Sequence, residues 1–378
     1  MIPDLRGRLK AVAEKPKQRE APNPCQVLEE RVPLSALGCV LDVTAADVRR
    51  MGLEVPNFDV RRALFLDTET TGLRGAGTVA FLIGVGWVEG EEFVVRQLLM
   101  QDYPEEAHQL EMLAEMLPRF DVAVTFNGKS FDVPLLRDRF TMARLRDRWR
   151  ELHQLDLLHT ARRVWRLRLG TCSLGELEEH VLGIARENDL PGAEVPERYF
   201  AYLKTGDRSL LEDVLRHNSQ DIRTLAVLLA RLKAVFDMPE RQTSMMDVFS
   251  VGRALERCGE GELARRCFTV ASVSALSERA RVELALSYRR AQDFGQAAEA
   301  YRSMIARGEG GVDAYIRLAV LLEWRLKDRV GALEATEKAL WRFSGRMDAE
   351  VIRALERRRS RLRRRLEKDR GGEGHGTV

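Results

Sequence analysis

The chain has 378 residues, of which 45% are hydrophobic and 31% are charged, and its formal net charge at pH 7 is +3. This composition is ordinary for a soluble, helix-rich protein with two or three domains. The longest uncharged apolar stretch, Val79–Val88, is too short to cross a bilayer, and no apolar segment of a signal peptide follows Met1. We therefore expect a cytoplasmic protein that has no membrane partner.

The chain contains five cysteines, and no two of them have the C-x-x-C spacing of a metal or redox motif. The cysteine pattern therefore argues against a disulfide framework and against a zinc site. We expect reduced thiols, as in a reducing compartment.

The first 59 residues have no function that the sequence reveals. Residues 1–24 are polar and contain several prolines, which predicts a mobile arm. Residues 25–59 carry only brief apolar pieces, and we expect them to form a small extension packed on the next domain.

From Arg62 to Leu99 the pattern predicts strand, turn, strand, turn and strand, with the clearest hairpin signal at WVEGEEF. We expect a helix at 105–117 and a buried strand at 122–125, and an almost wholly helical chain after Ser130. Consecutive strands followed by alternating strand and helix are typical of an α/β domain with a mixed sheet. We place this domain at residues 60–237.

Two acidic residues stand at the end of the first strand of that domain. Ala63–Leu66 is apolar and leads directly into Asp67, and alternate residues of a strand share a face, so Asp67 and Glu69 point the same way. Neighbouring carboxylates repel each other, which is tolerable when divalent cations lie between them. Phosphodiester cleavage uses such a pair of ions, and hard oxygen ligands favour Mg²⁺ or Mn²⁺. Taken alone, the spacing of Asp67 and Glu69 would indicate only an exposed strand end.

Two further acids follow on predicted helices. Asp132 opens an amphipathic stretch, where its ordinary role would be that of an acid favoured by the helix dipole. His217 and Asp221 lie one turn apart on a long predicted helix at 210–233, so the histidine is a candidate general base beside a metal-bound Asp221. A structural hydrogen bond is the alternative for this pair. The order of these acids along the chain points to a two-metal nuclease.

These motifs resemble the DEDD (DnaQ-like) exonuclease superfamily, and within it the YprB-like branch of predicted bacterial exonucleases. The resemblance covers about residues 60–235 and rests on the motifs FLDTETTGL, GTVAFLIGVG, VTFNGKSFDVPLL, DLLHTARRVW, SLGELEEHVLGIAR and HNSQDI. It implies a ribonuclease H-like fold and two divalent metals. By matching position, the implied metal ligands are Asp67, Glu69, Asp132 and Asp221. His217 would be the base that orients the nucleophilic water.

The chain departs from the family pattern at this histidine. It stands four residues before the last aspartate, where the DEDDy subgroup has a tyrosine, whereas the DEDDh subgroup has its histidine one residue earlier. A shift by one helical position turns a side chain by about 100°. The resemblance therefore supports the metal ligands more directly than it supports His217.

Other residues of these motifs are candidates for supporting roles. Asp156 aligns with a family aspartate, and we expect it to support the metal ligands or the fold rather than to bind metal directly. Thr70, Asn127 and Lys129 are the expected substrate-binding residues, and an amide and a point cation suit a phosphate. The alternative for residues 127 and 129 is ordinary turn chemistry in an Asn-Gly loop.

Short helical segments rich in Ala, Leu and Arg follow Met238. Ala285 and Ala297, with Tyr301 after them, fit the spacing of a tetratricopeptide repeat, and a similar set recurs about 34 residues later. We expect a helical repeat domain at residues 245–345 that engages substrate or a protein partner. A plain helical bundle is the alternative.

Positive charge is concentrated in the C-terminal segment, residues 346–378. From Arg346 to Arg370 there are eleven Lys or Arg against five Asp or Glu. A helix there would present a cationic stripe able to bind a phosphate backbone without reading its sequence. A solvated terminal helix is the alternative, and we expect the glycine-rich segment beyond Arg370 to be a disordered tail.

The sequence therefore predicts an α/β, ribonuclease H-like domain followed by an all-α, tetratricopeptide-like domain. We expect a 3′–5′ exonuclease that hydrolyses single-stranded or frayed DNA or RNA with two Mg²⁺ or Mn²⁺ ions. The alternatives are a structure-specific endonuclease, and a nucleic-acid- or protein-binding scaffold with a decayed nuclease site. DNA and RNA are not distinguished, because no motif identifies contacts to the 2′-hydroxyl.

Overall fold

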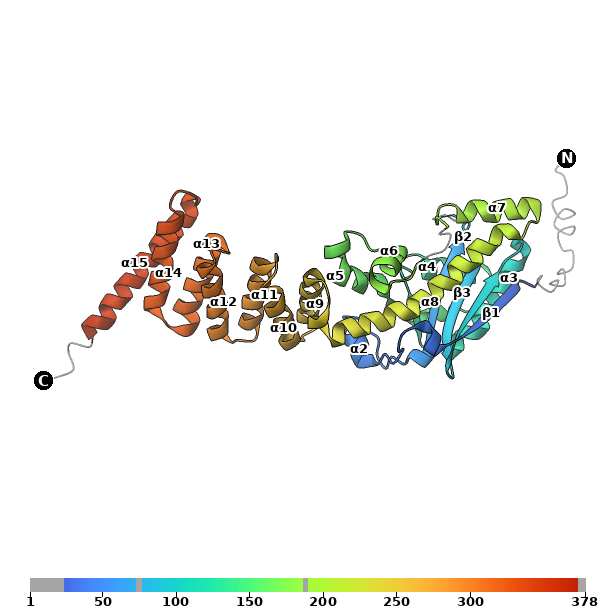
Figure 1. The fold of residues 1–378 in the computed structure, drawn as a ribbon, viewed down its shortest axis with the longest axis horizontal. Coiled ribbons are helices and arrows are strands. Elements are labelled where there is room, and N and C mark those ends of the chain that lie inside the picture. Colours follow the sequence, from blue (N-terminus) through green and yellow to red (C-terminus); the bar gives the residue numbers. More distant parts are fainter. Residues whose placement is uncertain (1–23, 73–76, 186–189, 373–378) are drawn as a thin grey trace, which may run out of the picture. The chain divides into compact units, whose positions relative to one another are not determined.

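The computed structural model describes residues 24–72, 77–185 and 190–372. The arm expected at residues 1–24, except Pro24, lies outside the described residues. Of the tail expected beyond Arg370, residues 371 and 372 belong to the last helix, and the rest lies outside the described residues. Packing divides the chain into two compact units. The colours of Figure 1 follow the sequence from the N-terminus to the C-terminus. The first unit comprises residues up to Asp42, Asn57–Leu157 and Glu178–Leu228, and the second comprises Val43–Pro56, Leu158–Leu177 and the residues from Leu229 onwards. The domain boundaries expected from the sequence stay predictions.

The first unit is built on a mixed six-stranded sheet (Figure 1). In sheet order the strands are β1 (Gln26–Pro33), β4 (Glu92–Leu99), β3 (Ala80–Glu89), β2 (Ala63–Thr70), β5 (Val122–Thr125) and β6 (His153–Asp156). The pairs β1–β4, β4–β3 and β3–β2 are antiparallel, whereas β2–β5 and β5–β6 are parallel. This mixed sheet confirms the predicted α/β layout. The predicted hairpin is also confirmed, because Glu89 pairs with Glu92 and Gly90 between them has a φ of 62°.

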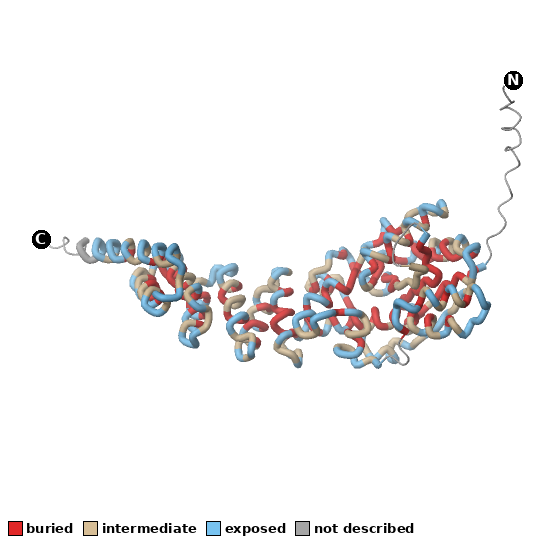
Figure 2. The backbone as a smooth tube through the Cα atoms, turned by 90° about the horizontal axis from the view of Figure 1, so that it is seen from above, coloured by how far each residue is buried: buried red, intermediate tan, exposed pale blue. Residues whose placement is uncertain are grey.

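Helices cover both faces of the sheet. On one face, Leu64 and Leu66 of β2 belong to a buried cluster with side chains of α3 (Glu106–Met116) and α4 (Asp132–Met142). On the other face, strand residues such as Leu82 pack with α7 (Val195–Thr205) and the first part of α8 (Ser209–Asp237). Strand β3 is accordingly buried except at Glu89, and β5 is buried throughout. Figure 2 colours the buried parts of the backbone red. Burial on both faces explains why β2 begins with four consecutive apolar residues.

Two strands differ from the sequence-based expectation. Residues 26–33, expected within a packed extension, are the edge strand β1, in which Val27 pairs with Leu98 of β4. Most of β1 is exposed or half-buried, so its hydrophobic pattern is weak. After Ser130 the described chain is almost wholly helical, as predicted, but His153–Asp156 forms an unexpected strand, β6, beside β5. A strand of four residues is too short for its periodicity to identify it.

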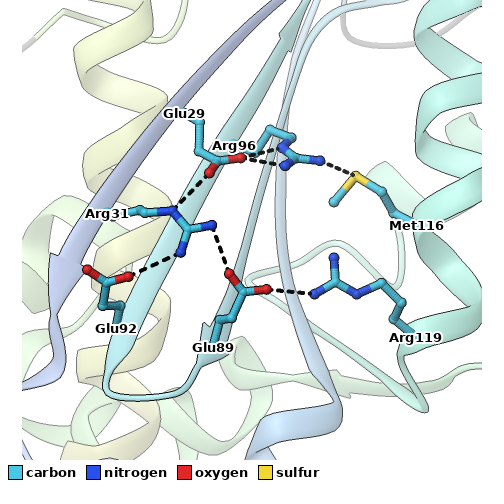
Figure 3. Close-up of polar contacts among 7 residues, drawn as sticks. All are labelled: Glu29, Arg31, Glu89, Glu92, Arg96, Met116 and Arg119. Carbon is cyan, nitrogen blue, oxygen red and sulfur yellow. Dashed lines mark hydrogen bonds and ion pairs between the residues drawn. The ribbon is translucent and has the colours of Figure 1, made fainter.

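Charged side chains cover the sheet where β1, β4 and the end of β3 meet (Figure 3). Arg31 of β1 pairs with Glu89 at 2.8 Å and with Glu92 at 3.1 Å. Glu29 accepts hydrogen bonds from both Arg31 and Arg96. Exposed ion pairs contribute little stability individually. Their position on an edge strand instead opposes pairing with the edge of another sheet.

The second unit is helical. Its helices are α2 (Ala45–Arg50), α5 (Leu157–Leu169), α6 (Leu174–Leu177), α9 (Met245–Arg257), α10 (Gly261–Ala271), α11 (Ser277–Arg290), α12 (Phe294–Ala306), α13 (Gly311–Leu321), α14 (Arg329–Phe343) and α15 (Ala349–Gly372). From α9 to α15, each helix packs on the next. Ala285, Ala297 and Ala319 are buried where neighbouring helices meet. The helical C-terminal region is therefore confirmed, whereas its tetratricopeptide character stays a prediction. Every helix in the described ranges is too short or too polar to cross a membrane.

The basic run predicted near the C-terminus lies on α15. Leu355 and Leu362 of this helix are buried in the helical unit. Glu323, whose side chain is only 1% exposed, pairs with Arg361 at 2.8 Å and with Arg358 at 3.6 Å. Part of the positive charge of α15 is therefore bound within the unit instead of being presented to solvent.

Candidate functional site

The carboxyl end of β2 carries Asp67 and Glu69. Both alternate with Thr68 along the strand, so both lie on the face of the sheet that α8 covers. β2 keeps its register with β3 as far as Glu69, opposite Leu82, and the register shifts between Glu69 and Thr70. Such irregularities are frequent beside functional sites, because they change the direction of a side chain at a strand end.

α8 brings a buried amide to this end of β2. Asn218 is fully buried, and its Nδ2 donates a hydrogen bond to Oδ2 of Asp67 at 2.9 Å. Its Oδ1 accepts from Nε2 of Gln97 at 3.0 Å, and the same Nε2 donates to the carbonyl oxygen of Leu215 at 2.8 Å. This connected network fixes the orientation of the Asn218 amide and, through it, one oxygen of Asp67.

Neither Asn218 nor Gln97 is among the site residues predicted from the sequence. One signal in the sequence was Asn218 itself, a polar residue next to His217 on a helix whose core-facing positions are otherwise apolar. A second signal was the pair of glycines at alternate positions of β3, Gly84 and Gly86, which marks a close approach to a strand.

These two glycines allow α8 to lie directly on β3. A Cβ built on Gly84 would be 2.1 Å from Oδ1 of Asn218, and a Cβ on Gly86 would be 2.5 Å from Cγ2 of Ile222. Gly84 is the residue that pairs with Asp67 in the β2–β3 ladder. The missing side chain at this position therefore creates the space in which Asn218 reaches Asp67.

His217 and Asp221 lie together on α8. Nε2 of His217 is 3.4 Å from Oδ2 of Asp221. Asp221 is buried, with 8% of its surface exposed, and the side chain of His217 is 17% exposed. Their spacing of four residues places them on one face of the helix, as the sequence predicts.

Asp132 reaches the end of β2 from the opposite face of the sheet. It is the first residue of α4, and its Oδ1 accepts a hydrogen bond from the hydroxyl of Thr68 at 2.5 Å. Burial raises the pKa of Asp132 to about 6, although the Thr68 hydrogen bond acts in the opposite direction. A carboxyl group with this pKa is about half protonated at pH 6, where an ordinary aspartate is almost fully ionised.

The four predicted carboxyl groups influence one another. The pKa of Asp67 is raised well above its ordinary value, first by burial and then by the negative charges of Asp221, Glu69 and Asp132. The hydrogen bond from Asn218 lowers this pKa but does not offset the other effects. The structure therefore brings together at one end of β2 the acids that the sequence places on three separate elements.

This donor set fits hard divalent cations. Carboxylate oxygens are the ligands that Mg²⁺ and Mn²⁺ prefer, and a cation among them would remove the repulsion that raises the pKa of Asp67. Within the described residues, no group of three or more His, Cys, Asp or Glu is already arranged to hold a metal ion. Oxygens of Asp67 and Asp132 are instead hydrogen-bonded to Asn218 and Thr68.

Asp156 shapes the loop between β5 and α4. Its two carboxylate oxygens accept hydrogen bonds from the backbone N–H groups of Asn127 at 2.9 Å and Lys129 at 3.3 Å. Asn127 has a φ of 68°, and the side chains of both loop residues are exposed. The hydroxyl of Thr70 donates to the carbonyl oxygen of Gly72 at 2.8 Å. Asp156 is thus bonded to the loop that carries two of the predicted substrate-binding residues.

Comparison with known proteins supports the fold. Residues 64–233 match the family model of the RNase_H superfamily. The chain is also 29% identical over 300 residues to the "Uncharacterized protein YprB" of Bacillus subtilis (strain 168), a match that covers 76% of this chain and 71% of that protein. All the predicted site residues, from Asp67 to Asp221, fall within the matched range. The chain therefore contains a ribonuclease H-like domain with a mixed six-stranded sheet, together with a helical C-terminal region.

Proposed function

We propose that the ribonuclease H-like domain is a metal-dependent nuclease, and that it acts as a 3′–5′ exonuclease on single-stranded or frayed DNA or RNA. The observation that carries this proposal is the meeting of four carboxyl groups at the end of β2. Acids gathered in this way destabilise a protein unless cations lie among them. When bound, two Mg²⁺ or Mn²⁺ ions would activate the attacking water and stabilise the leaving oxygen.

Two acids in the proposal, Asp67 and Asp132, accept hydrogen bonds that prepare them for their role. Asp67, Glu69, Asp132 and Asp221 would be the metal ligands. Asn218 donates to Asp67 and Thr68 donates to Asp132, and such hydrogen bonds favour the charged carboxylate that a metal requires. They also restrict the rotation of both carboxyl groups, so that less ordering is needed when a cation binds.

His217 is the proposed general base. Its imidazole would take a proton from the attacking water, a role that histidine side chains commonly fill in catalysis. The Asp221 carboxylate, 3.4 Å from Nε2, would orient the ring and stabilise the imidazolium that forms. The proposal keeps this role for His217 although its position along the helix is that of a tyrosine in the DEDDy subgroup.

Substrate contacts are proposed for Asn127, Lys129 and Thr70. Asn127 and Lys129 belong to an exposed loop, and Asp156 holds the backbone of this loop through two hydrogen bonds. A phosphate would therefore bind without reorganisation of the loop. Thr70 lies directly after the acids on β2. A cytoplasmic location, and a protein partner for the helical region, also remain predictions.

The proposal is tested by turnover of end-labelled single-stranded DNA and RNA with Mn²⁺, Mg²⁺ or EDTA. Wild type is compared with Asp67→Asn, which removes a metal ligand at nearly constant volume, and with Asp138→Asn, which changes an exposed acid on α4. We expect a metal-dependent ladder that shortens from the 3′ end with wild type and Asp138→Asn, and none with Asp67→Asn. Near wild-type activity of Asp67→Asn would refute the assigned site. Internal fragments would indicate an endonuclease, and absence of cleavage by folded wild type would favour a scaffold.

A further inference from the structure

The second unit contains an arginine-lined pocket of about 520 Å³ between α5, α9 and α11. It is defined here by six arginines: Arg162, Arg163 and Arg166 of α5, Arg253 and Arg257 of α9, and Arg279 of α11. All six belong to the second compact unit and all are exposed. The pocket therefore lies outside the ribonuclease H-like sheet and its cluster of acids.

Local helix geometry directs these arginines to one side. Ala161, Val164 and Trp165 of α5 are buried, so the arginines between them point away from the core. Arg253 and Arg257 are one turn apart and share a face of α9. The positive charges therefore converge from separate helices on a concave surface instead of spreading around one solvated helix.

An ion pair connects two walls of the pocket. Nε of Arg168, near the end of α5, lies 3.0 and 2.9 Å from the two carboxylate oxygens of Asp247 on α9. Asp247 is 5% exposed, so this contact is shielded from water. Breaking a shielded pair of this kind is costly. The relative positions of the α5 and α9 arginines are thus fixed before any ligand binds.

The pocket is poor in compensating negative charge. Among the described residues, no acidic residue lines it, and the ion pair of Arg253 is a long contact, 3.6 Å, with Glu283 outside the lining. Within the described part of the chain, no ion pair to a carboxylate is found for Arg162, Arg166 or Arg257. This differs from α15, where Arg358 and Arg361 pair with the buried Glu323. The pocket is consequently a site of concentrated positive potential.

We propose that the arginine-lined pocket binds phosphate groups of a nucleic-acid strand and holds the substrate outside the catalytic site. This inference rests on the proposed function, because it takes the substrate to be a nucleic acid. Guanidinium groups bind phosphate in a bidentate manner and form the preferred contacts to a nucleic-acid backbone. The aromatic residue of the lining, Phe249, is 2% exposed and offers no ring for base stacking. The contacts are therefore to the backbone and independent of base sequence.

The test compares two variants that lose the same charge. The pocket variant is Arg162→Gln/Arg166→Gln/Arg257→Gln. The control is Arg302→Gln/Arg329→Gln/Arg363→Gln, whose arginines lie on α12, α14 and α15 and pair with Glu299, Asp369 and Glu337. Binding of a labelled single-stranded oligonucleotide to the full chain is followed by fluorescence anisotropy in EDTA, over a range of KCl concentrations. Circular dichroism checks that both variants are folded.

We expect the pocket variant to bind at least about tenfold more weakly than wild type in moderate salt, with a salt slope that is smaller by about two units. The control should stay within about threefold of wild type, because its arginines are already neutralised by local carboxylates. Equal losses in the two variants, or no loss in the pocket variant, would overturn the proposal. Binding of inorganic tripolyphosphate to the same proteins is a further comparison. If the pocket variant loses tripolyphosphate binding but binds the oligonucleotide as wild type does, the proposal is also overturned, and the pocket is assigned to a small anion.

The same measurements separate this inference from the proposed function. If wild type cleaves nucleic acid but the pocket variant binds it like the control, only the pocket assignment fails. If wild type neither binds nor cleaves nucleic acid, the proposed function fails and the pocket assignment fails with it.

Discussion

Asp67 is held in surroundings that disfavour its negative charge. Burial and three neighbouring carboxylates raise its pKa, and the Asn218 amide acts in the opposite direction. Groups with strongly perturbed pKa values are concentrated at functional sites, because the arrangement reduces stability unless a ligand offsets it. At the scale of single residues, the candidate site is therefore a region where the metal-free fold loses stability.

Asp132 allows this loss to be measured. Its pKa is about 6 in the folded chain and about 4 when unfolded, so the folded state binds the proton more tightly. The stability that protonated Asp132 contributes is present at low pH and is lost as pH rises from about 4 to about 6. We expect Asp132→Asn, which keeps an oxygen for Thr68, to exceed wild type in stability by on the order of 2 kcal/mol at pH 7 in EDTA, and by little at pH 4.

Urea unfolding at a series of pH values, followed for wild type and Asp132→Asn in EDTA, measures this difference. Asp138→Asn on the exposed side of α4 is the matched control and should follow wild type throughout. A constant difference between Asp132→Asn and wild type over the whole pH range would show that the effect does not come from the charge of Asp132.

His217 gives a second prediction at this scale. We expect His217→Ala to slow metal-dependent cleavage by a factor of about 10² to 10⁴, the usual effect of removing a general base. His153→Ala, which changes an exposed histidine at the start of β6, serves as the control in the same single-turnover assay. A reduction of less than threefold in His217→Ala would mean that another group positions the water.

At the scale of elements, the contact between α8 and β3 determines the geometry of the site. Asn218 reaches Asp67 only because Gly84, the partner of Asp67 in the sheet, has no side chain. The long helix thus contributes in two ways, through Asp221 and His217 and through the amide that orients Asp67. The position of the acids depends on this packing as much as on the strand that carries them.

Gly84→Ala tests the importance of this close contact. The added methyl group would overlap Asn218, and we expect a loss of about 1 to 3 kcal/mol in the free energy of unfolding, together with reduced cleavage. Gly192→Ala is the control, since a Cβ at that position meets nothing within 4 Å. Urea unfolding and the turnover assay measure both effects. Wild-type stability of Gly84→Ala would show that α8 can move away from β3 at no cost.

At the scale of the whole molecule, basic residues lie in two different electrostatic environments. The basic run on α15 is partly neutralised by the buried Glu323. The arginine-lined pocket, by contrast, gathers charge from three helices, and no acidic residue that the structure describes lines it. The density of basic residues along the chain is therefore a poor guide to where a phosphate backbone would bind.

Deleting residues 346–378 should weaken nucleic-acid binding and flatten its salt dependence, but the structure predicts a second effect. Glu323 would lose Arg358 and Arg361, and Leu355 and Leu362 would be removed from the core. An unpaired buried charge costs about 3 to 5 kcal/mol, so we expect the helical region to melt at a clearly lower temperature, as measured by calorimetry.

The control for this deletion is the triple variant Arg353→Gln/Arg357→Gln/Arg364→Gln. It removes exposed charges of α15 and keeps the helix. We expect it to retain the wild-type melting temperature, so that any change in its salt slope reports on binding alone. An unchanged slope would assign α15 a purely structural role.

The sequence by itself determined the elements that carry the candidate site. The apolar run before Asp67 identified β2, and the helical spacing around Asp221 identified α8, because local periodicity fixes which residues of an element share a face. It also identified the acids that meet at the end of β2. Their roles as metal ligands, like the tetratricopeptide character of the helical region, stay predictions.

Only the tertiary structure decided which distant segments meet. It paired β1 with β4 and β6 with β5, placed Asn218 against Asp67 through the gap at Gly84, and gathered arginines from three helices into one pocket. Each of these features joins residues far apart in the chain. Local patterns do not identify which residues form such pairs, because their energy comes from contacts that exist only after the chain has folded.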